Sequence, residues 1–414
     1  MKAERWALAG LTVILSAMMA QEPGLNLPAA LGAAAWLAAL WAAAWGLNRW
    51  GEHDRWLLPL AGILNSLGLL LAFRLEPSAF PRDVGLSVLG LGVLLGAAFL
   101  IKRRPRLVGA YRPMALAALG ILLFTAVAGR QVHGARSWLF LGPLSVEPSQ
   151  LALVLLTVAA GMAVRRPWEW SAAVVAAAGL AATHNLGAVL ALALVLGGVA
   201  YLAGWGYRPL VVGAVTFVLL SLIFYLVFPV VHARLALWLA PTREPRTEGY
   251  QMMQAFHSFA RGGWWGRGLA GATPGRIPAA GTDFVYAAWA QIAGTVGVWA
   301  ILAGYLVFLA RGLAASANRF PQAALAARGL AILIACQAFL VAGGDTGLLP
   351  LTGVAMPFIS RGGSTLLGNY LAVGMLLGLG PAGALGGRER RVLGVAGAVA
   401  AVLALVSVGR GMAA

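Results

Sequence analysis

The chain has 414 residues, of which 61% are hydrophobic and 10% charged, with a mean hydropathy of +0.84 and a formal net charge of +17. A soluble surface needs far more charge, so this composition excludes an ordinary soluble domain and predicts an all-α, polytopic integral membrane protein. The basic residues lie in short breaks between apolar runs, Cys336 is the single cysteine, and the five histidines lack ligand spacing, which argues against a nucleic-acid-binding protein, a disulfide framework and a metal centre.

Apolar runs of spanning length follow one another from the first residues to the last. A bilayer core of roughly 30 Å needs about 20 apolar residues in a helix. On this basis the sequence predicts about 12–13 transmembrane helices, and the first is interpreted as a span rather than a cleaved signal peptide. They cover residues 6–20, 29–48, 56–73, 84–101, 110–129, 148–164, 170–184, 186–204, 209–230, 284–311, 327–343, 363–381 and 392–409.

The distribution of basic residues predicts the orientation. With the N-terminus in the cytoplasm, both lysines, Lys2 and Lys102, and every dense arginine cluster lie on the cytoplasmic side. The remaining arginines then lie outside, against the usual bias. Either a site on that face uses them, or they belong to a long loop that is translocated regardless of its charge.

One connection, residues 231–283, is long, and it carries half of these outer arginines. Loops of this length are usually functional or disordered. Its tryptophans favour a position at the membrane interface, and guanidinium groups bind phosphate oxygens well. The segment therefore fits either an anionic headgroup such as a lipid diphosphate or ordinary phospholipids. Its arginines are Arg234, Arg243, Arg246, Arg261, Arg267 and Arg276.

Asp283 ends this connection and directly precedes an apolar run. A helix dipole favours a carboxylate at such a position, and partial burial would raise its pKa toward that of a general base. The residue types alone favour a plain N-terminal helix residue over a catalytic one.

Four segments together carry a resemblance to a known family. They are HGARSWLFLGPLSVEPSQLALVLL (133–156), NLGAVLALAL (185–194), the stretch 249–294 with its Thr-Asp-Phe, and PLTGVAMPFISRGGSTLLGNYLAVGMLLGL (350–379). In this order and spacing they resemble the SEDS family of bacterial cell-wall glycosyltransferases, the group containing RodA and FtsW. The resemblance covers residues 57–382 and follows the longer variants with additional N-terminal helices.

The resemblance implies a membrane core of about ten helices over residues 55–385, with extra helices in 1–54 and 386–414. It also implies polymerisation of lipid II into peptidoglycan strands for cell elongation or division, with a class B penicillin-binding protein as partner. Asp283 carries over as the catalytic residue. The candidate substrate-binding residues are Arg136, Arg234, Arg243, Arg246, Arg261, Arg267, Gln337, Ser360, Arg361, Gly362, Gly363 and Ser364. The paired glycines are expected to allow close backbone approach to a neighbour or ligand.

Several charged family positions are neutral in this chain. The family's Gln-Pro-Ser-Glu is Glu147-Pro148-Ser149-Gln150 here, and the lysine that follows is a leucine. The neutral positions are Gln150, Leu153, Asn185, Ala279 and Gln291. A glutamate at 150 and a lysine at 153 would form an ion pair, so losing both avoids an unpaired charge in lipid.

These observations predict an inverting glycosyl transfer at the outer face, with Asp283 as base and arginines stabilising the diphosphate leaving group. No carboxylate pair prescribes a metal site, so a divalent cation such as Mg²⁺ or Mn²⁺ is only allowed for. The lost charges leave a non-catalytic scaffold for a transpeptidase as an alternative. A flippase for the lipid-linked precursor is another, although it would be expected to show inverted repeats.

Overall fold

The computed structural model describes residues 2–20, 25–104, 109, 111–132, 135–141, 144–165, 179–180, 185–208, 229–242, 248–314, 321–379 and 383–412, together with residues 211, 214, 215, 218, 219, 222, 225 and 226. The predicted spans 170–184 and 209–230 therefore lie mostly outside the described residues.

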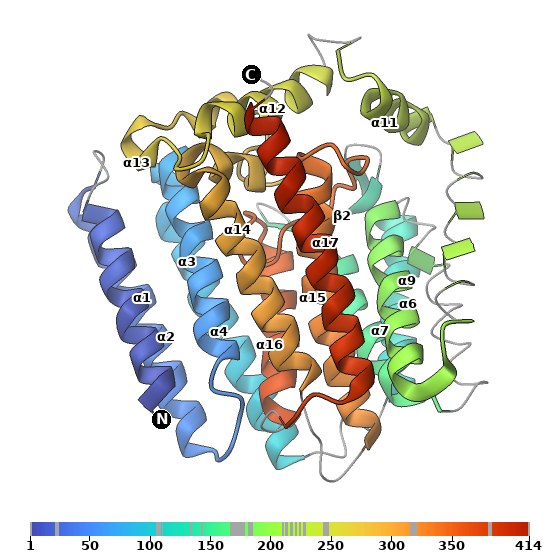
Figure 1. Cartoon of the computed structure of the whole chain (residues 1–414). Helices are drawn as coiled ribbons and strands as arrows, with labels where there is room; N and C mark the ends of the chain where they lie inside the picture. Colours follow the sequence, from blue (N-terminus) through green and yellow to red (C-terminus); the bar gives the residue numbers. More distant parts are fainter. Residues whose placement is uncertain are drawn as a thin grey trace.

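Long helices run side by side in one bundle (Figure 1). They are α1 (Lys2–Ala20), α2 (Leu27–Arg49), α3 (Leu57–Leu75), α4 (Phe80–Arg103), α6 (Tyr111–Ala128), α7 (Pro148–Ala163), α9 (Leu186–Ala200), α14 (Val285–Leu313), α15 (Pro321–Asp345), α16 (Gly363–Leu379) and α17 (Gly387–Met412). A π-helical turn, Tyr201–Trp205, extends α9. Among the described residues, eight helices are long and apolar enough to cross a membrane, and α7 and α16 are shorter apolar helices. The predicted all-α membrane architecture is confirmed.

The predicted long connection 231–283 contains helices of its own. α11 (Pro229–Leu239), α12 (Glu248–Gly262) and α13 (Gly268–Gly271) lie across one end of the bundle in Figure 1, and a 3-10 turn, Pro274–Arg276, follows them. In α12, Met252, Ala255 and Phe259 are buried, and this helical spacing gives one apolar face toward the bundle. We call this end of the bundle, where α3 ends and α14 and α16 begin, the Asp283 end.

A small antiparallel sheet departs from the all-helical prediction. Its strands are β1 (Arg130–Val132), β2 (Ala135–Leu141) and β3 (Leu144–Val146), in the order β1-β2-β3. β2 pairs with β3 in the register Leu139↔Val146 and Leu141↔Leu144. Strands this short give a weak periodic signal in the sequence, so they are difficult to predict. The sheet leads the chain from α6 into α7 at the Asp283 end.

α14 is interrupted at Gly294, whose backbone has φ +68° and ψ −173°. The N–H groups of Thr295 and Val296, freed by the break, donate to the carbonyls of Gly263 and Trp264. A side chain at Gly294 would place its Cβ 2.3 Å from the Gly266 nitrogen, so only glycine fits. The turn after α12 is thereby fastened to α14.

Close helix packing depends on small residues elsewhere as well. A Cβ at Gly374 of α16 would lie 2.4 Å from the Leu94 carbonyl oxygen of α4, and a Cβ at Gly161 of α7 would lie 2.3 Å from the Cα of Ala326 in α15. Such contacts let helix backbones approach closely in a membrane. α17 is part of the same bundle, because the Trp299 indole of α14 donates a hydrogen bond to its Ala404 carbonyl.

Candidate functional site

Asp283 lies in the loop between the turn Pro274–Arg276 and α14, one residue before the helix cap Phe284. The carbonyl of Ala279 accepts hydrogen bonds from the N–H groups of Thr282, Asp283 and Phe284, at 3.0, 3.1 and 3.2 Å. Ala279 has φ +55°, a left-handed conformation that costs a non-glycine residue about 1–2 kcal/mol. Such strain persists only where the surroundings hold it.

The segment 356–364, which we call the signature loop, holds the Asp283 loop in place. The Ser360 hydroxyl donates to the Thr282 carbonyl at 2.7 Å, and it accepts the Met356 N–H at 2.8 Å. The Arg361 N–H donates to the Gly281 carbonyl at 2.6 Å. Two of the residues before Asp283 are therefore fixed from a segment that is distant in the sequence.

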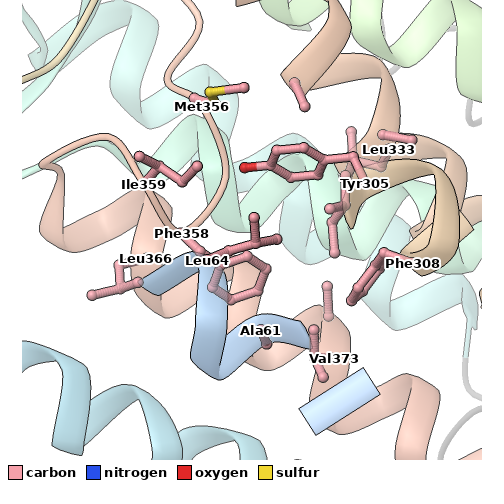
Figure 2. Close-up of a cluster of buried hydrophobic side chains, with 14 of the residues drawn as sticks. Ala61, Leu64, Tyr305, Phe308, Leu333, Met356, Phe358, Ile359, Leu366 and Val373 are labelled. Carbon is pink, nitrogen blue, oxygen red and sulfur yellow. The ribbon is translucent and has the colours of Figure 1, made fainter. Parts of the chain in front are cut away.

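The signature loop itself is seated in a buried cluster. Figure 2 shows Phe358 beside Leu64 of α3 and Met356 and Ile359 on the same loop, with the Tyr305 hydroxyl of α14 directed at the loop. That hydroxyl donates to the Pro357 carbonyl, and the Asn65 amide donates to the Phe358 carbonyl at 3.2 Å. Phe358 also has a positive φ, +66°. The two loops that meet beside Asp283 therefore both contain a strained non-glycine residue.

Asp345, the last residue of α15, caps α14 from another helix. Its side chain is fully buried, and its Oδ2 accepts the Ala287 N–H at 2.9 Å. Ala287 belongs to the first turn of α14, where backbone N–H groups have no partner within the helix. The start of the helix that follows Asp283 is thus fixed by a carboxylate, a signal that the sequence analysis missed.

Arg361 was expected to bind substrate phosphate, but the structure pairs it with two carboxylates. Its Nη1 lies 2.5 Å from Oε2 of Glu76, and its Nε lies 2.8 Å from Oδ2 of the buried Asp83. The hydrogen bond and the charge of Arg361 lower the pKa of the Glu76 carboxyl. These ion pairs link the residue after α3, the first turn of α4 and the signature loop.

Two further expectations are corrected. Asp283 is exposed rather than partly buried, so loss of solvent is not what prepares its carboxylate. The pair Gly362 and Gly363 does not approach a neighbouring backbone: a Cβ at Gly362 would lie 3.5 Å from the Thr365 hydroxyl, and one at Gly363 would lie 3.4 Å from a Leu86 methyl. The loop instead approaches Gly68 of α3 closely, where a Cβ would lie 2.6 Å from the Phe358 carbonyl oxygen.

A second carboxylate, Glu147, stands at the junction of β3 and α7. Its Oε1 accepts hydrogen bonds from the Ser149 hydroxyl at 2.9 Å and from Nδ2 of Asn185 at 3.2 Å. Its own N–H donates to the Ser364 hydroxyl at 2.8 Å. The pKa of the Glu147 carboxyl is raised to about 7: loss of solvent and the charge of Asp283 raise it, and the donors Ser149, Gln150 and Asn185 oppose the rise.

Two of the neutral departures from the family pattern, Gln150 and Asn185, contact Glu147. Gln150 is buried on α7, and its Oε1 accepts a hydrogen bond from Nε2 of Gln337 on α15 at 3.3 Å. Leu153, on the same helix, is fully buried. Gln337 was predicted as a substrate-binding residue, and the structure places it in this interhelical contact.

Arg234 of α11 lies on the same side of the site. Its guanidinium nitrogens would be 3.6 Å from a Cβ at Gly353, in the segment leading to the signature loop. A Cβ at Gly187 would lie 2.6 Å from the Thr352 carbonyl, so this segment packs on the first turn of α9, just after Asn185. The structure thus brings Arg234 near the Glu147 side of the Asp283 end.

Arg261 and Arg267 lie further from Asp283. The Arg267 N–H donates to the Gln291 carbonyl, and its Nε donates to the Arg261 carbonyl at 3.0 Å. Gln291 lies in the second turn of α14, about 9 Å along the helix from its first residue. The adjacent Trp265 is 81% exposed, which fits the interfacial position predicted for this segment.

The side chains of three predicted substrate-binding residues lie outside the described part of the chain. The Arg136 side chain and the whole of Arg243 and Arg246 lie outside the described residues, although the Arg136 backbone belongs to β2. In the part of the chain that the structure describes, no group of three or more His, Cys, Asp or Glu side chains is arranged to hold a metal ion. A divalent cation therefore stays an expectation without a site built from those residues.

The chain is similar in sequence to known bacterial proteins. A family model described as cell cycle protein, FtsW/RodA/SpoVE, matches residues 76–380. The peptidoglycan glycosyltransferase RodA of Mycobacterium tuberculosis (strain ATCC 25618 / H37Rv) is 33% identical over 364 residues, covering 78% of this chain and 77% of the relative. A probable peptidoglycan glycosyltransferase FtsW of Nitrosococcus halophilus (strain Nc4) is 36% identical over 287 residues, covering 64% of this chain and 73% of the relative.

Two solved structures share the fold. One chain, from a structure described as structural coordination of polymerization and crosslinking by a peptidoglycan synthase complex, matches with a TM-score of 0.64 and 28% identity, covering 78% of this chain and 96% of that chain. The rod shape determining protein RodA of Thermus thermophilus matches with a TM-score of 0.58 and 26% identity, covering 80% and 97%. Both likenesses extend over nearly the whole of the solved chains.

Proposed function

Because the chain belongs to the FtsW/RodA/SpoVE family of cell cycle proteins, we propose that it is a peptidoglycan glycosyltransferase of the bacterial cytoplasmic membrane. Its substrate is lipid II, an undecaprenyl diphosphate-linked disaccharide, which it polymerises into glycan strands at the outer face. The observation that carries the proposal is the position of Asp283: an exposed carboxylate whose loop is held by hydrogen bonds from Ser360 and Arg361. A fixed, solvent-accessible base is what proton abstraction from a sugar hydroxyl requires.

The reaction that we propose inverts the configuration of the donor sugar. Asp283 takes the proton from the 4-hydroxyl of the acceptor sugar while that oxygen bonds to the donor's anomeric carbon. The bond from this carbon to the diphosphate breaks, and the lipid diphosphate leaves with the electron pair. Developing charge on the leaving group needs cations nearby. Arg234, whose guanidinium lies against the segment leading to the signature loop, is a candidate for this role.

We further propose that the Asp283 end faces away from the cytoplasm. Lys102, at the opposite end, donates to the Gly51 and Glu52 carbonyls, and the dense basic clusters of the short loops lie at that end. A class B penicillin-binding protein, the single-span transpeptidase, is the partner that we propose. The likeness to a chain of a peptidoglycan synthase complex supports this partner.

The test is polymerisation by the purified protein. Fluorescent lipid II is supplied in detergent, with and without the cognate transpeptidase, to the wild type and to Asp283→Asn. We expect long glycan strands from the wild type alone, with lipid II binding and the melting temperature of the variant largely unchanged. Polymerisation by Asp283→Asn would remove Asp283 from the mechanism.

A non-catalytic scaffold for the transpeptidase is the second candidate, favoured by the neutral residues at charged family positions. That candidate predicts no strands from the wild type even with the partner present and lipid II bound. A flippase predicts transfer of lipid II across a vesicle membrane without polymerisation.

A further inference from the structure

The polar side chains around Glu147 donate hydrogen bonds to its carboxylate. Asn185 is the N-cap of α9, where its Oδ1 accepts the Ala188 N–H at 3.1 Å. The orientation of its amide is thereby determined, so its Nδ2 points to Glu147 and donates. Gln150 is oriented in a similar way, because its Oε1 accepts the Gln337 amide and its nitrogen remains for Glu147.

Among the residues that the structure describes, this network contains neutral donors and no cation. Ser149, Gln150 and Asn185 are neutral, and within the described part of the chain no lysine or arginine forms an ion pair with Glu147. A structural carboxylate in a membrane protein is normally paired with a cation. Glu147 is instead half-buried and held by neutral groups.

Glu147 and Asp283 belong to one site. The Ser364 hydroxyl, which accepts the Glu147 N–H, lies in the first turn of α16, and the signature loop that precedes this turn binds the Asp283 loop through Ser360. The negative charge of Asp283 raises the pKa of the Glu147 carboxyl. Among the described residues, Asp283 is the charged group that has this effect. A ligand placed against Asp283 is therefore close to a second negative group.

We infer that Glu147 is a second substrate-binding carboxylate of this site, which accepts hydrogen bonds from the sugar part of the lipid-linked substrate. The inference rests on the proposed function and deepens it. An uncompensated carboxylate repels a diphosphate, whereas the hydroxyl and amide N–H groups of a sugar are donors that it can accept. Glu147 thus turns the neutral sugar toward α7 and α9, and the diphosphate away from them.

The experiment compares two lipids by direct binding, so its outcome does not depend on polymerisation. Lipid II and undecaprenyl diphosphate, which lacks the sugar, are titrated onto the wild type, Glu147→Gln and Glu52→Gln in detergent. Glu52 is an exposed carboxylate at the opposite end of the bundle and serves as the matched control. Glutamine at 147 can still accept the Ser149 and Asn185 hydrogen bonds, so the fold is expected to be retained.

We expect Glu147→Gln to weaken lipid II binding roughly tenfold to a hundredfold, the effect of losing a hydrogen bond to a charged group, and to leave undecaprenyl diphosphate binding as strong as before or stronger, because a repelling charge is removed. In the wild type the preference for lipid II over undecaprenyl diphosphate should fall as the pH is lowered through about 7, and in Glu147→Gln it should not depend on pH. Equal effects on both lipids, or none on either, would overturn the inference. Failure of the proposed function has a different signature: the wild type would bind lipid II with this preference and form no strands.

Discussion

The hydroxyl of Ser360 lies 2.7 Å from the carbonyl oxygen of Thr282 and donates a hydrogen bond to it. This bond joins the signature loop to the residue that directly precedes Asp283. Because Ser360 is buried and its oxygen also accepts the Met356 N–H, the geometry of both loops depends on one side chain. The position of the proposed base is therefore set by a residue that does no chemistry itself.

Ser360→Ala should consequently impair polymerisation more than stability. Loss of the two hydrogen bonds is expected to cost about 1–3 kcal/mol of unfolding free energy, while a misplaced base lowers the catalytic rate roughly a hundredfold. Strand formation and thermal unfolding are measured in parallel. Ser258→Ala, which removes a buried hydroxyl bonded within its own helix, is the control. A rate reduced no more than in this control would show that Ser360 has no positioning role.

Asp345 is predicted to act through the start of α14. Asp345→Asn keeps an acceptor for the Ala287 N–H, so it should retain much of the activity, whereas Asp345→Ala removes the cap. Loss of a cap costs about 0.5–2 kcal/mol and here also frees the residues after Asp283. The melting temperature and the rate of strand formation distinguish the two variants. Indistinguishable alanine and asparagine variants would argue against a capping role.

Leu153→Lys tests why two charges are absent from α7. Leu153 is fully buried, so a lysine there lacks both water and a partner and should lower the melting temperature strongly. Adding Gln150→Glu supplies a carboxylate one turn away, which should recover part of the loss. Thermal unfolding in detergent compares the single and double variants. Equal melting temperatures would contradict the compensation.

The ion pairs of Arg361 should differ in their importance. Asp83 is buried and Glu76 is half exposed, with 8% and 53% of their side chains accessible. Arg361→Ala leaves the Asp83 charge buried without this partner and should destabilise the protein by about 3–5 kcal/mol. Glu76→Gln should have little effect on stability because water screens that pair. Chemical denaturation followed by tryptophan fluorescence measures both, and an equal loss in the two variants would refute the distinction.

The raised pKa of Glu147 predicts that the stability of the protein depends on pH even without substrate. Its pKa is raised from 4.5 to about 7, so the folded state holds the proton more tightly than the unfolded state does. Stability is therefore fully present below pH 4.5 and is lost as the pH rises through about 7. Relative to Glu147→Gln, the wild type should lose melting temperature over this range. If the melting temperatures of the two proteins changed with pH in the same way, folding would not raise the pKa of Glu147.

The sequence by itself determined the class of protein and most of its helices. Long apolar runs such as those of α3, α4 and α14 have few alternatives to a membrane-spanning helix, because each residue's backbone groups must be satisfied within the segment. It also singled out Asp283 through the Thr-Asp-Phe segment, a local pattern that needs no knowledge of contacts.

Only the tertiary structure decided what the polar residues do. Arg361 could be read as a phosphate ligand until Glu76 and Asp83, about 280 residues earlier, were found beside it. Glu147 was noted only as a departure, since its donors come from two helices and its neighbour Asp283 from a third segment. Charge pairing and pKa depend on distances between segments remote in the sequence, and hydropathy and spacing carry no information about those distances.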